Sequence, residues 1–178
     1  MGPVLLFEVL PYSQIIEVKR RGLTLVEVMV ITSIVALLAV VAIQSLTRSR
    51  VVTIESTVIA NLRTLANSLE MYHSANQQYP GDWQADLYTN VDPDFGPPGF
   101  NLPMNGSTLQ GYTYTYSPLP SGCTSACIDY TLSSIPQTVG ATGTRAFLVD
   151  RSGIIRHCVG AGPANVSNQP IGQAPNAC

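Results

Sequence analysis

Charged side chains are scarce in this chain, and positive charge is not in excess. Only 11% of the 178 residues are Asp, Glu, Lys or Arg, and the formal net charge is −2. Proteins that bind nucleic acid independently of its sequence neutralise phosphates with many Lys and Arg side chains. The composition therefore argues against a nucleic-acid partner. A local patch of Arg145, Arg151 and Arg156 is an alternative, although a solvated strand face explains these residues better.

Helix-breaking residues are absent from a long stretch near the N-terminus. Neither glycine nor proline occurs between Leu23 and Tyr79. Because proline interrupts helices and glycine destabilises them, this absence predicts one continuous helix that ends before Pro80. At about 1.5 Å per residue, such a helix would be on the order of 80 Å long.

Histidines and recognisable catalytic motifs are also scarce. The only histidines are His73, expected at a helix end, and His157, expected in a strand. No serine stands in a G-x-S-x-G motif, and no two carboxylates show the pairing of an acid–base site. The sequence therefore predicts no enzyme activity and no catalytic residue. An extracytoplasmic enzyme or binding domain held by a signal anchor is the distant alternative.

Apolar sequence is abundant near the N-terminus. Residues 23–46, "LTLVEVMVITSIVALLAVVAIQSL", form a run long enough to cross a bilayer as a helix of about 20 residues. A basic cluster at residues 19–21 precedes the run, which predicts a cytoplasmic N-terminus and an exported C-terminal part. A secretory signal would have a shorter apolar region that ends at a small-residue cleavage site. The run continues instead into a helical pattern, so we expect a single membrane span.

Glu27 is a carboxylate inside this apolar run. Inserting a charged side chain into a bilayer costs at least about 2.5 kcal/mol, and such residues are usually paired and functional. A plain uncleaved signal anchor does not account for it. Glu27 is therefore a candidate functional residue.

The residues that lead to Glu27 resemble a known processing site. The segment "RRGLTLVE", residues 20–27, is similar to the site that prepilin peptidase cuts in type IV pilins and type II secretion pseudopilins. The resemblance implies cleavage between Gly22 and Leu23, N-methylation of Leu23, and an assembly role for Glu27. Leu23 is a departure from the family pattern, in which Phe is the usual first residue of the mature chain.

Elementary electrostatics supports the role that the resemblance implies for Glu27. Cleavage would leave a positively charged amine on Leu23 in apolar surroundings. Glu27 would lie one helical turn away, and it could also reach the amine of a neighbouring subunit. Pairing the two charges would offset a burial cost that neither bears alone. The resemblance further implies prepilin peptidase, identical or related pilin subunits, and an inner-membrane assembly platform as partners.

Residues 47–79 are expected to continue the helix with one apolar face. The segment "LANSLEMYHSANQQYP", residues 65–80, resembles the last helical turns of major pseudopilins. Apolar residues at spacings of three and four predict packing of this half against a core. The apolar stripe comprises Val51, Ile54, Val58, Leu62, Leu65, Leu69 and Tyr72, and the opposite face carries Thr53, Ser56, Asn61, Arg63, Asn67 and Glu70.

Residues 80–178 are expected to form a loop-rich antiparallel sheet. Residues 80–111 hold five prolines and five glycines, which predicts a long irregular connection. Strands are predicted over residues 111–118 and 129–135, and residues 145–158 are typical of a hairpin. With the striped helix covering the sheet, the fold class is α+β, and the arrangement resembles the pilin fold.

Four aspartates in the connection raise the question of calcium binding. Their spacing does not complete an EF-hand loop, because the third acid and the closing glutamate are missing. We therefore expect a solvated loop, no metal and no cofactor. These residues are Asp82, Asp86, Asp92 and Asp94.

All four cysteines lie in the C-terminal third, at Cys123, Cys127, Cys158 and Cys178. An even number in an exported chain is typical of disulfides. Four cysteines allow three pairings, and the sequence does not choose among them. We favour the two local pairings, of which Cys158 with Cys178 would contribute roughly 3 kcal/mol by closing a loop in the unfolded chain. The C-x₃-C spacing matches neither a zinc pair nor a haem attachment site.

The sequence thus predicts four parts. A cleaved leader (1–22) precedes the membrane and filament-core half of the helix (23–46), its amphipathic half (47–79) and the sheet head (80–178). The chain would cross the inner membrane once, with a periplasmic C-terminus, and would then enter a periplasmic pseudopilus or an extracellular pilus. The helix end favours a type II secretion pseudopilin, which we prefer. The terminal cysteine pair favours a true type IV pilin of a surface pilus for adhesion, motility or DNA uptake.

Overall fold

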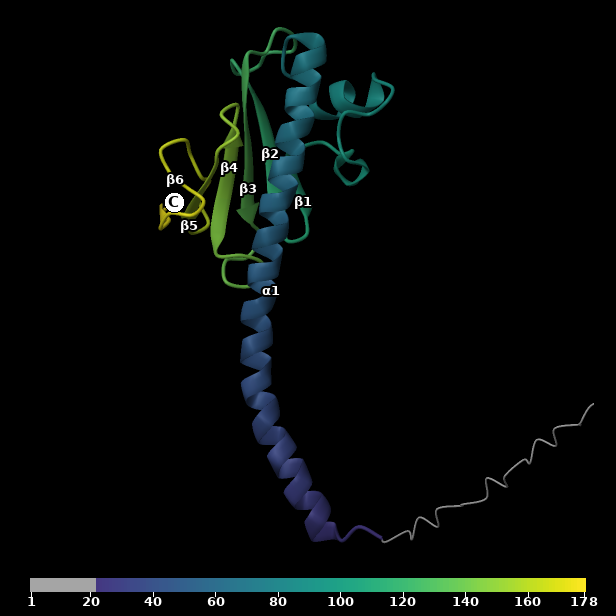
Figure 1. The fold of residues 1–178 in the computed structure, drawn as a ribbon, viewed down its shortest axis with the longest axis vertical. Coiled ribbons are helices and arrows are strands. Elements are labelled where there is room, and N and C mark those ends of the chain that lie inside the picture. The colour runs from purple at the N-terminus through teal and green to yellow at the C-terminus, as the bar shows by residue number, and fades with distance from the viewer. Residues whose placement is uncertain (1–21) are drawn as a thin grey trace, which may run out of the picture. The chain divides into compact units, whose positions relative to one another are not determined.

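The computed structural model describes residues 22–178, apart from the side chain of Gln44 (Figure 1). The basic cluster at residues 19–21 and the rest of the predicted leader before Gly22 lie outside the described residues. The chain divides into two units, one ending at Val41 and one extending from Ala42 to Cys178.

The predicted continuous helix is confirmed. Helix α1 spans Leu25–Asn76, and it ends before Pro80 as expected. Its end is set by Gln77, which has a positive φ of 59° and whose N–H donates to His73 O at 2.8 Å. A left-handed residue that bonds back to the last turn is a common helix terminus.

The C-terminal part forms a mostly antiparallel sheet, so the fold class is α+β, as predicted (Figure 1). The sheet order is β1-β2-β3-β4-β5-β6, and β7 pairs in parallel with β5. The strands are β1 (Asn105–Leu109), β2 (Tyr112–Leu119), β3 (Asp129–Pro136), β4 (Arg145–Asp150), β5 (Ile155–Val159), β6 (Gln169–Pro170) and β7 (Asn176–Ala177).

The three strand predictions are confirmed, including the hairpin of β4 and β5. Its turn is closed by a hydrogen bond of 2.9 Å from Gly153 N–H to Asp150 O, and Ser152 N–H donates to Asp150 Oδ1 at 2.8 Å. Gly153 has a φ of 70°, a conformation that glycine adopts without steric cost. Aspartate and glycine at these two positions therefore specify the turn.

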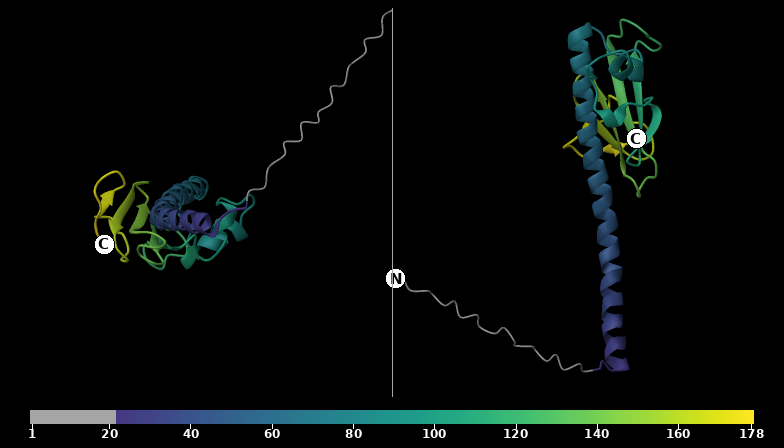
Figure 2. Two further views of the ribbon diagram at one scale, coloured as in Figure 1. Left: turned by 90° about the horizontal axis from the view of Figure 1, so that it is seen from below. Right: turned by 90° about the vertical axis from the view of Figure 1, so that its right-hand side faces the viewer.

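The striped half of α1 packs along one face of the sheet (Figure 2). Val58, Leu62, Leu65 and Leu69 are fully buried, whereas the residues predicted for the opposite face are mostly exposed. The period-two tyrosines of β2 supply the facing layer. Their side chains form one core with the helix, and they comprise Tyr112, Tyr114 and Tyr116.

Buried tyrosine hydroxyls need hydrogen-bond partners, and the β2 tyrosines find them. Tyr112 Oη donates to Arg145 O at 2.9 Å, and Tyr116 Oη donates to Pro80 O at 2.8 Å. Burial raises the pKa of both hydroxyls, and nearby negative charge acts in the same direction, so both stay protonated at any ordinary pH. Besides filling the core, Tyr112 therefore ties β2 to the start of β4, and Tyr116 ties β2 to the chain that follows α1.

The prediction of an irregular connection over residues 80–111 is wrong at its C-terminal end, where β1 pairs with β2. The strand lacks the apolar alternation by which strands are recognised, because it lies at the sheet edge and most of its side chains are exposed. Its pairing register shifts between Asn105 and Ser107, with Gly106 at a φ of 91°. This irregularity hides the strand from pattern analysis.

Candidate assembly site

The predicted processing residues directly precede helix α1. Gly22 and Leu23 are exposed and non-helical, and Thr24 is the N-cap. Thr24 Oγ1 accepts a hydrogen bond from Glu27 N–H at 3.2 Å, which satisfies one of the free donors at the helix start. The peptide bond between Gly22 and Leu23 therefore lies in exposed chain just outside a capped helix.

Glu27 lies in the first turn of α1 and is exposed. A Thr-x-x-Glu segment is the signature of a capping box, in which the glutamate returns a bond to the N-cap N–H. Here only the Thr24 half is formed: within residues 22–178, the Glu27 carboxylate accepts no hydrogen bond and joins no ion pair. The Thr-x-x-Glu spacing of Thr24 and Glu27 is readable in the sequence. The carboxylate is available to a donor from elsewhere.

The first part of α1, up to Val41, exposes apolar side chains all round. By length and composition this helix could cross a membrane, since an 18-residue window has a mean hydropathy of 2.7 and none of it is buried. An apolar surface of this kind needs lipid or other helices to cover it. The large side chains involved are Leu25, Val26, Val28, Met29, Val30, Ile31, Ile34, Val35, Leu37, Leu38, Val40 and Val41.

In the second unit, a buried carboxylate joins the helix to the sheet. Glu55, only 4% exposed, projects from α1 toward the start of β4. Its Oε1 accepts from Thr144 N–H at 2.7 Å, Thr144 Oγ1 at 2.8 Å and Arg145 N–H at 3.2 Å. Its Oε2 accepts from Arg145 Nε at 2.8 Å and forms an ion pair with Arg145 Nη2 at 2.6 Å. Both oxygens are thus fully engaged.

This surrounding determines the charge state of Glu55. Burial by itself raises the pKa of a carboxyl group, but the hydrogen bonds from Thr144 and Arg145 and the Arg145 charge outweigh it and hold the pKa of Glu55 below its ordinary value. The carboxylate is therefore ionised at neutral pH. Because Arg145 Nε and Nη2 both contact Oε2 while Thr144 holds Oε1, the geometry is fixed and sets the register between α1 and β4.

The hydrogen-bond chain continues from Glu55 toward the C-terminal segment. Arg145 Nη1 lies 3.2 Å from His157 Nδ1, and His157 Nε2 lies 3.1 Å from Gln173 O. Since a guanidinium only donates and a carbonyl only accepts, Nδ1 is the acceptor and Nε2 carries the proton. His157 is 1% exposed and lies in β5, the strand location that the sequence predicts. His157 therefore has a structural role, because it links Arg145 to the backbone of Gln173.

Sequence reasoning missed Glu55, although a signal was present. Glu55 precedes Val58 by three positions and Leu62 by seven, so it belongs to the apolar face of the helix. A lone carboxylate on such a face requires a buried partner. Its partner, Arg145, is 90 positions away, and no local pattern indicates that distance.

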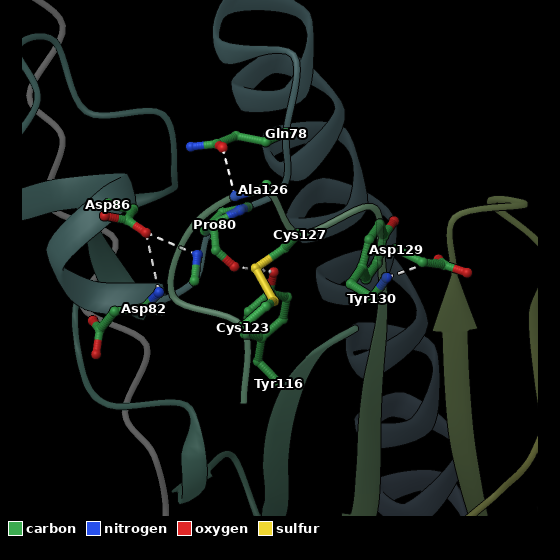
Figure 3. Close-up of a disulfide and its surroundings, with 11 residues drawn as sticks. Gln78, Pro80, Asp82, Asp86, Tyr116, Cys123, Ala126, Cys127, Asp129 and Tyr130 are labelled. Atoms are coloured by element: carbon green, nitrogen blue, oxygen red, sulfur yellow. Dashed lines mark hydrogen bonds between the residues drawn. A yellow bond between two sulfur atoms is a disulfide. The ribbon is translucent and has the colours of Figure 1, made fainter. Parts of the chain in front are cut away.

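The structure joins Cys123 to Cys127 and Cys158 to Cys178, which are the two local pairings that the sequence favours. Around the first disulfide, Ala126 N–H donates to Gln78 Oε1 at 2.7 Å (Figure 3). The backbone of Cys127 also pairs with that of Tyr79. The loop after β2 is thereby held against the end of α1. The second disulfide ties the last residue to β5.

The aspartates nearest to this loop serve as backbone caps. Asp86 Oδ2 accepts from Gly81 N–H at 2.8 Å and from Asp82 N–H at 3.0 Å (Figure 3). Asp82 Oδ1 accepts from Ala85 N–H at 2.8 Å. Within residues 22–178, no three His, Cys, Asp or Glu side chains lie together in a way that could hold a metal ion.

The patch considered for Arg145, Arg151 and Arg156 is not a common surface. Arg145 pairs with Glu55, Arg151 donates to Ile128 O at 3.4 Å, and Arg156 donates to Asn168 O at 3.2 Å. The three guanidinium groups are thus directed to different elements of the head.

Glu55→Gln tests the buried pair. The amide cannot accept all the donors around Glu55, and Arg145 loses its counter-ion, so we expect the free energy of unfolding to fall by about 2–4 kcal/mol. Thermal unfolding of the full chain in detergent, followed by circular dichroism, measures the loss. The control is Glu70→Gln, an exposed helical glutamate with a single hydrogen bond of 2.9 Å from Tyr79 Oη. A loss under about 1 kcal/mol is expected there, and equal losses in both variants would refute the special role of Glu55.

The lowered pKa of Glu55 also predicts a pH dependence. A depressed folded-state pKa stabilises the fold above the unfolded value, 4.5, and this contribution is lost as pH falls through the folded value. The stability difference between the wild type and Glu55→Gln should therefore be constant near neutral pH and shrink in acid. Urea titrations at a series of pH values measure it, and a difference that stays constant into acid would contradict the prediction.

Comparison of the chain with protein-family models, with curated proteins and with solved structures finds no match in any of the three.

Proposed function

We propose that this chain is a membrane-inserted subunit of a filament similar to type IV pili and type II secretion pseudopili. In this proposal the chain is cleaved after Gly22 and polymerises through the first part of α1. The observation that carries the proposal is the contrast along one helix: apolar side chains are exposed all round up to Val41, whereas the later turns pack on a sheet. An uncovered apolar helix attached to a folded head is suited to both lipid and a bundle of like helices.

The proposed assembly moves the apolar helix from lipid into a helical bundle. Lipid and protein interiors are similarly apolar, so packing and specific polar contacts must favour the bundle. Glu27 supplies such a contact if it pairs with the amine that cleavage creates at Leu23, on its own or a neighbouring chain. Its carboxylate has no partner within residues 22–178, which leaves it available for this pairing.

The fold supports this proposal in its general architecture, a long helix with a sheet packed on its second half. A pilin-like head is proposed here from the sheet of β1–β7, which packs on the striped half of α1. A type II secretion pseudopilin is the preferred form because of the resemblance of residues 65–80. One observation favours a surface type IV pilin instead: the Cys158–Cys178 disulfide encloses the C-terminal segment, as the family's surface pilins often do.

The lysine content offers a direct test of processing. Lys19 is the only lysine in the sequence, so a chain that begins at Leu23 contains one primary amine, at its new terminus. A methylated amine in such a chain therefore lies at Leu23. Intact mass spectrometry of membranes and sheared fibres should find a chain that starts at a methylated Leu23 and carries both disulfides. Recovery in fibres would favour a surface pilus, and recovery only in membranes would favour a periplasmic pseudopilus. An intact Met1 terminus in cells that process prepilins would refute the proposal.

Glu27→Gln tests the assembly step separately from cleavage. The amide cannot neutralise the terminal amine, and removing one partner of a buried ion pair costs about 3–5 kcal/mol. We therefore expect normal cleavage but at least tenfold less filament, measured by quantifying sheared or cross-linked polymer. The control is Glu70→Gln, an exposed acid in the second unit. Filament at the wild-type level in Glu27→Gln would contradict the assembly role.

A further inference from the structure

Charge is unevenly distributed within the second unit. The sequence from Thr64 to Thr144 contains no lysine and no arginine. Arg48, Arg50 and Arg63 lie on α1 before this stretch, and the first two lie where the helix enters the unit. The acids within the stretch are Glu70, Asp82, Asp86, Asp92, Asp94 and Asp129.

The basic and acidic ends of the unit are too far apart to neutralise each other in one copy. Arg50 precedes the last helical residue, Asn76, by 26 positions, which is about 39 Å along the axis at about 1.5 Å per residue. Charges are screened over about 8 Å at physiological salt. Arg50, Asp92 and Asp94 are exposed, and within residues 22–178 no hydrogen bond or ion pair involves their side chains.

Asp92 and Asp94 border a groove beside the end of α1. Its volume is about 420 Å³, and apolar side chains form much of its wall. Met71 on its helix side is 60% exposed. The groove is lined by Met71, Ala75, Val91, Phe95 and their neighbours Asn76 and Pro93.

The other end of the unit presents a complementary helix face. Leu46 and Arg50 are four positions apart, so they share one side of α1. Both are exposed, Leu46 at 64%. Arg48 differs, because it lines a separate groove of about 470 Å³ with Gly140 and Thr144 of its own head.

We propose that the groove bordered by Asp92 and Asp94 receives Leu46 and Arg50 from a second copy of this chain. Leu46 covers Met71, and the Arg50 guanidinium pairs with the two carboxylates. Each copy then offers the groove at one end and the helix face at the other. A contact between unlike surfaces closes into a ring or extends an open filament, and the filament is the form that the proposed function requires. The inference rests on the proposed function for its assembled state, and it deepens that function by naming the contact between heads.

Paired cysteine substitutions test the contact in the full-length chain in its native membranes. All four native cysteines are in disulfides, so introduced cysteines are the only free thiols. Arg50→Cys with Asp94→Cys should give a ladder of dimers, trimers and longer species on a non-reducing gel after mild oxidation. The control pair, Arg48→Cys with Asp94→Cys, should give no ladder. Dimers alone, or ladders of equal strength in both pairs, would overturn the inference.

Charge reversal provides a second test that does not depend on oxidation. Arg50→Glu and Asp94→Arg should each lower filament recovery severalfold, since an exposed ion pair accounts for up to about fivefold per contact. The double variant should restore recovery, whereas Arg48→Glu should have little effect. If the wild type forms methylated filaments but neither test gives the expected result, the inference fails and the proposed function stands. If the wild type is not processed, the proposed function itself fails.

Discussion

The buried contact between Glu55 and Arg145 is the interaction on which the rest of the head depends. A charged pair in a small core is tolerated only when every oxygen and donor is satisfied. Here Thr144 and Arg145 satisfy both Glu55 oxygens at the start of β4. Apolar contacts between helix and sheet would tolerate a shift along the axis, but this geometry does not. The contact therefore specifies where the head is attached along α1.

The attachment of the head divides α1 into a covered part and an uncovered part. The later turns bury Val58, Leu62 and Leu65 against the sheet, and this packing contributes to the stability of the helix. The first turns receive no such cover from the described chain, and their helical structure rests on an all-apolar sequence with a Thr24 cap. Covering them requires lipid or other chains. A fixed attachment point makes the length of the uncovered part constant in every copy, which a repeating assembly requires.

Local sequence patterns predicted much of the fold. The features that they did not predict depend on the sheet edge and on contacts between distant residues. The helix and the strands at residues 111–118 and 129–135 were predictable because each buries one face at a regular period. β1 was not, because an edge strand with an irregular register has little periodicity. The partner of Glu55 lies 90 positions away, so only the need for a partner was readable. The Thr24 cap was readable in full and shows that Glu27 has a local context as well as a proposed intermolecular one.

The charges of the chain fall into two kinds that differ in what they can do. Glu55 and Arg145 are engaged with each other and with the backbone, so they specify the fold and cannot take part in recognition without breaking it. Arg50, Asp92 and Asp94 are exposed, and about 39 Å of helix separates Arg50 from Asn76, beside which the two aspartates lie. Because these side chains are exposed, substituting them changes the stability of the isolated fold little. Folding alone therefore does not require that the opposite charges be separated. Separation of opposite charges to opposite ends of one unit has a physical consequence only when copies meet end to end.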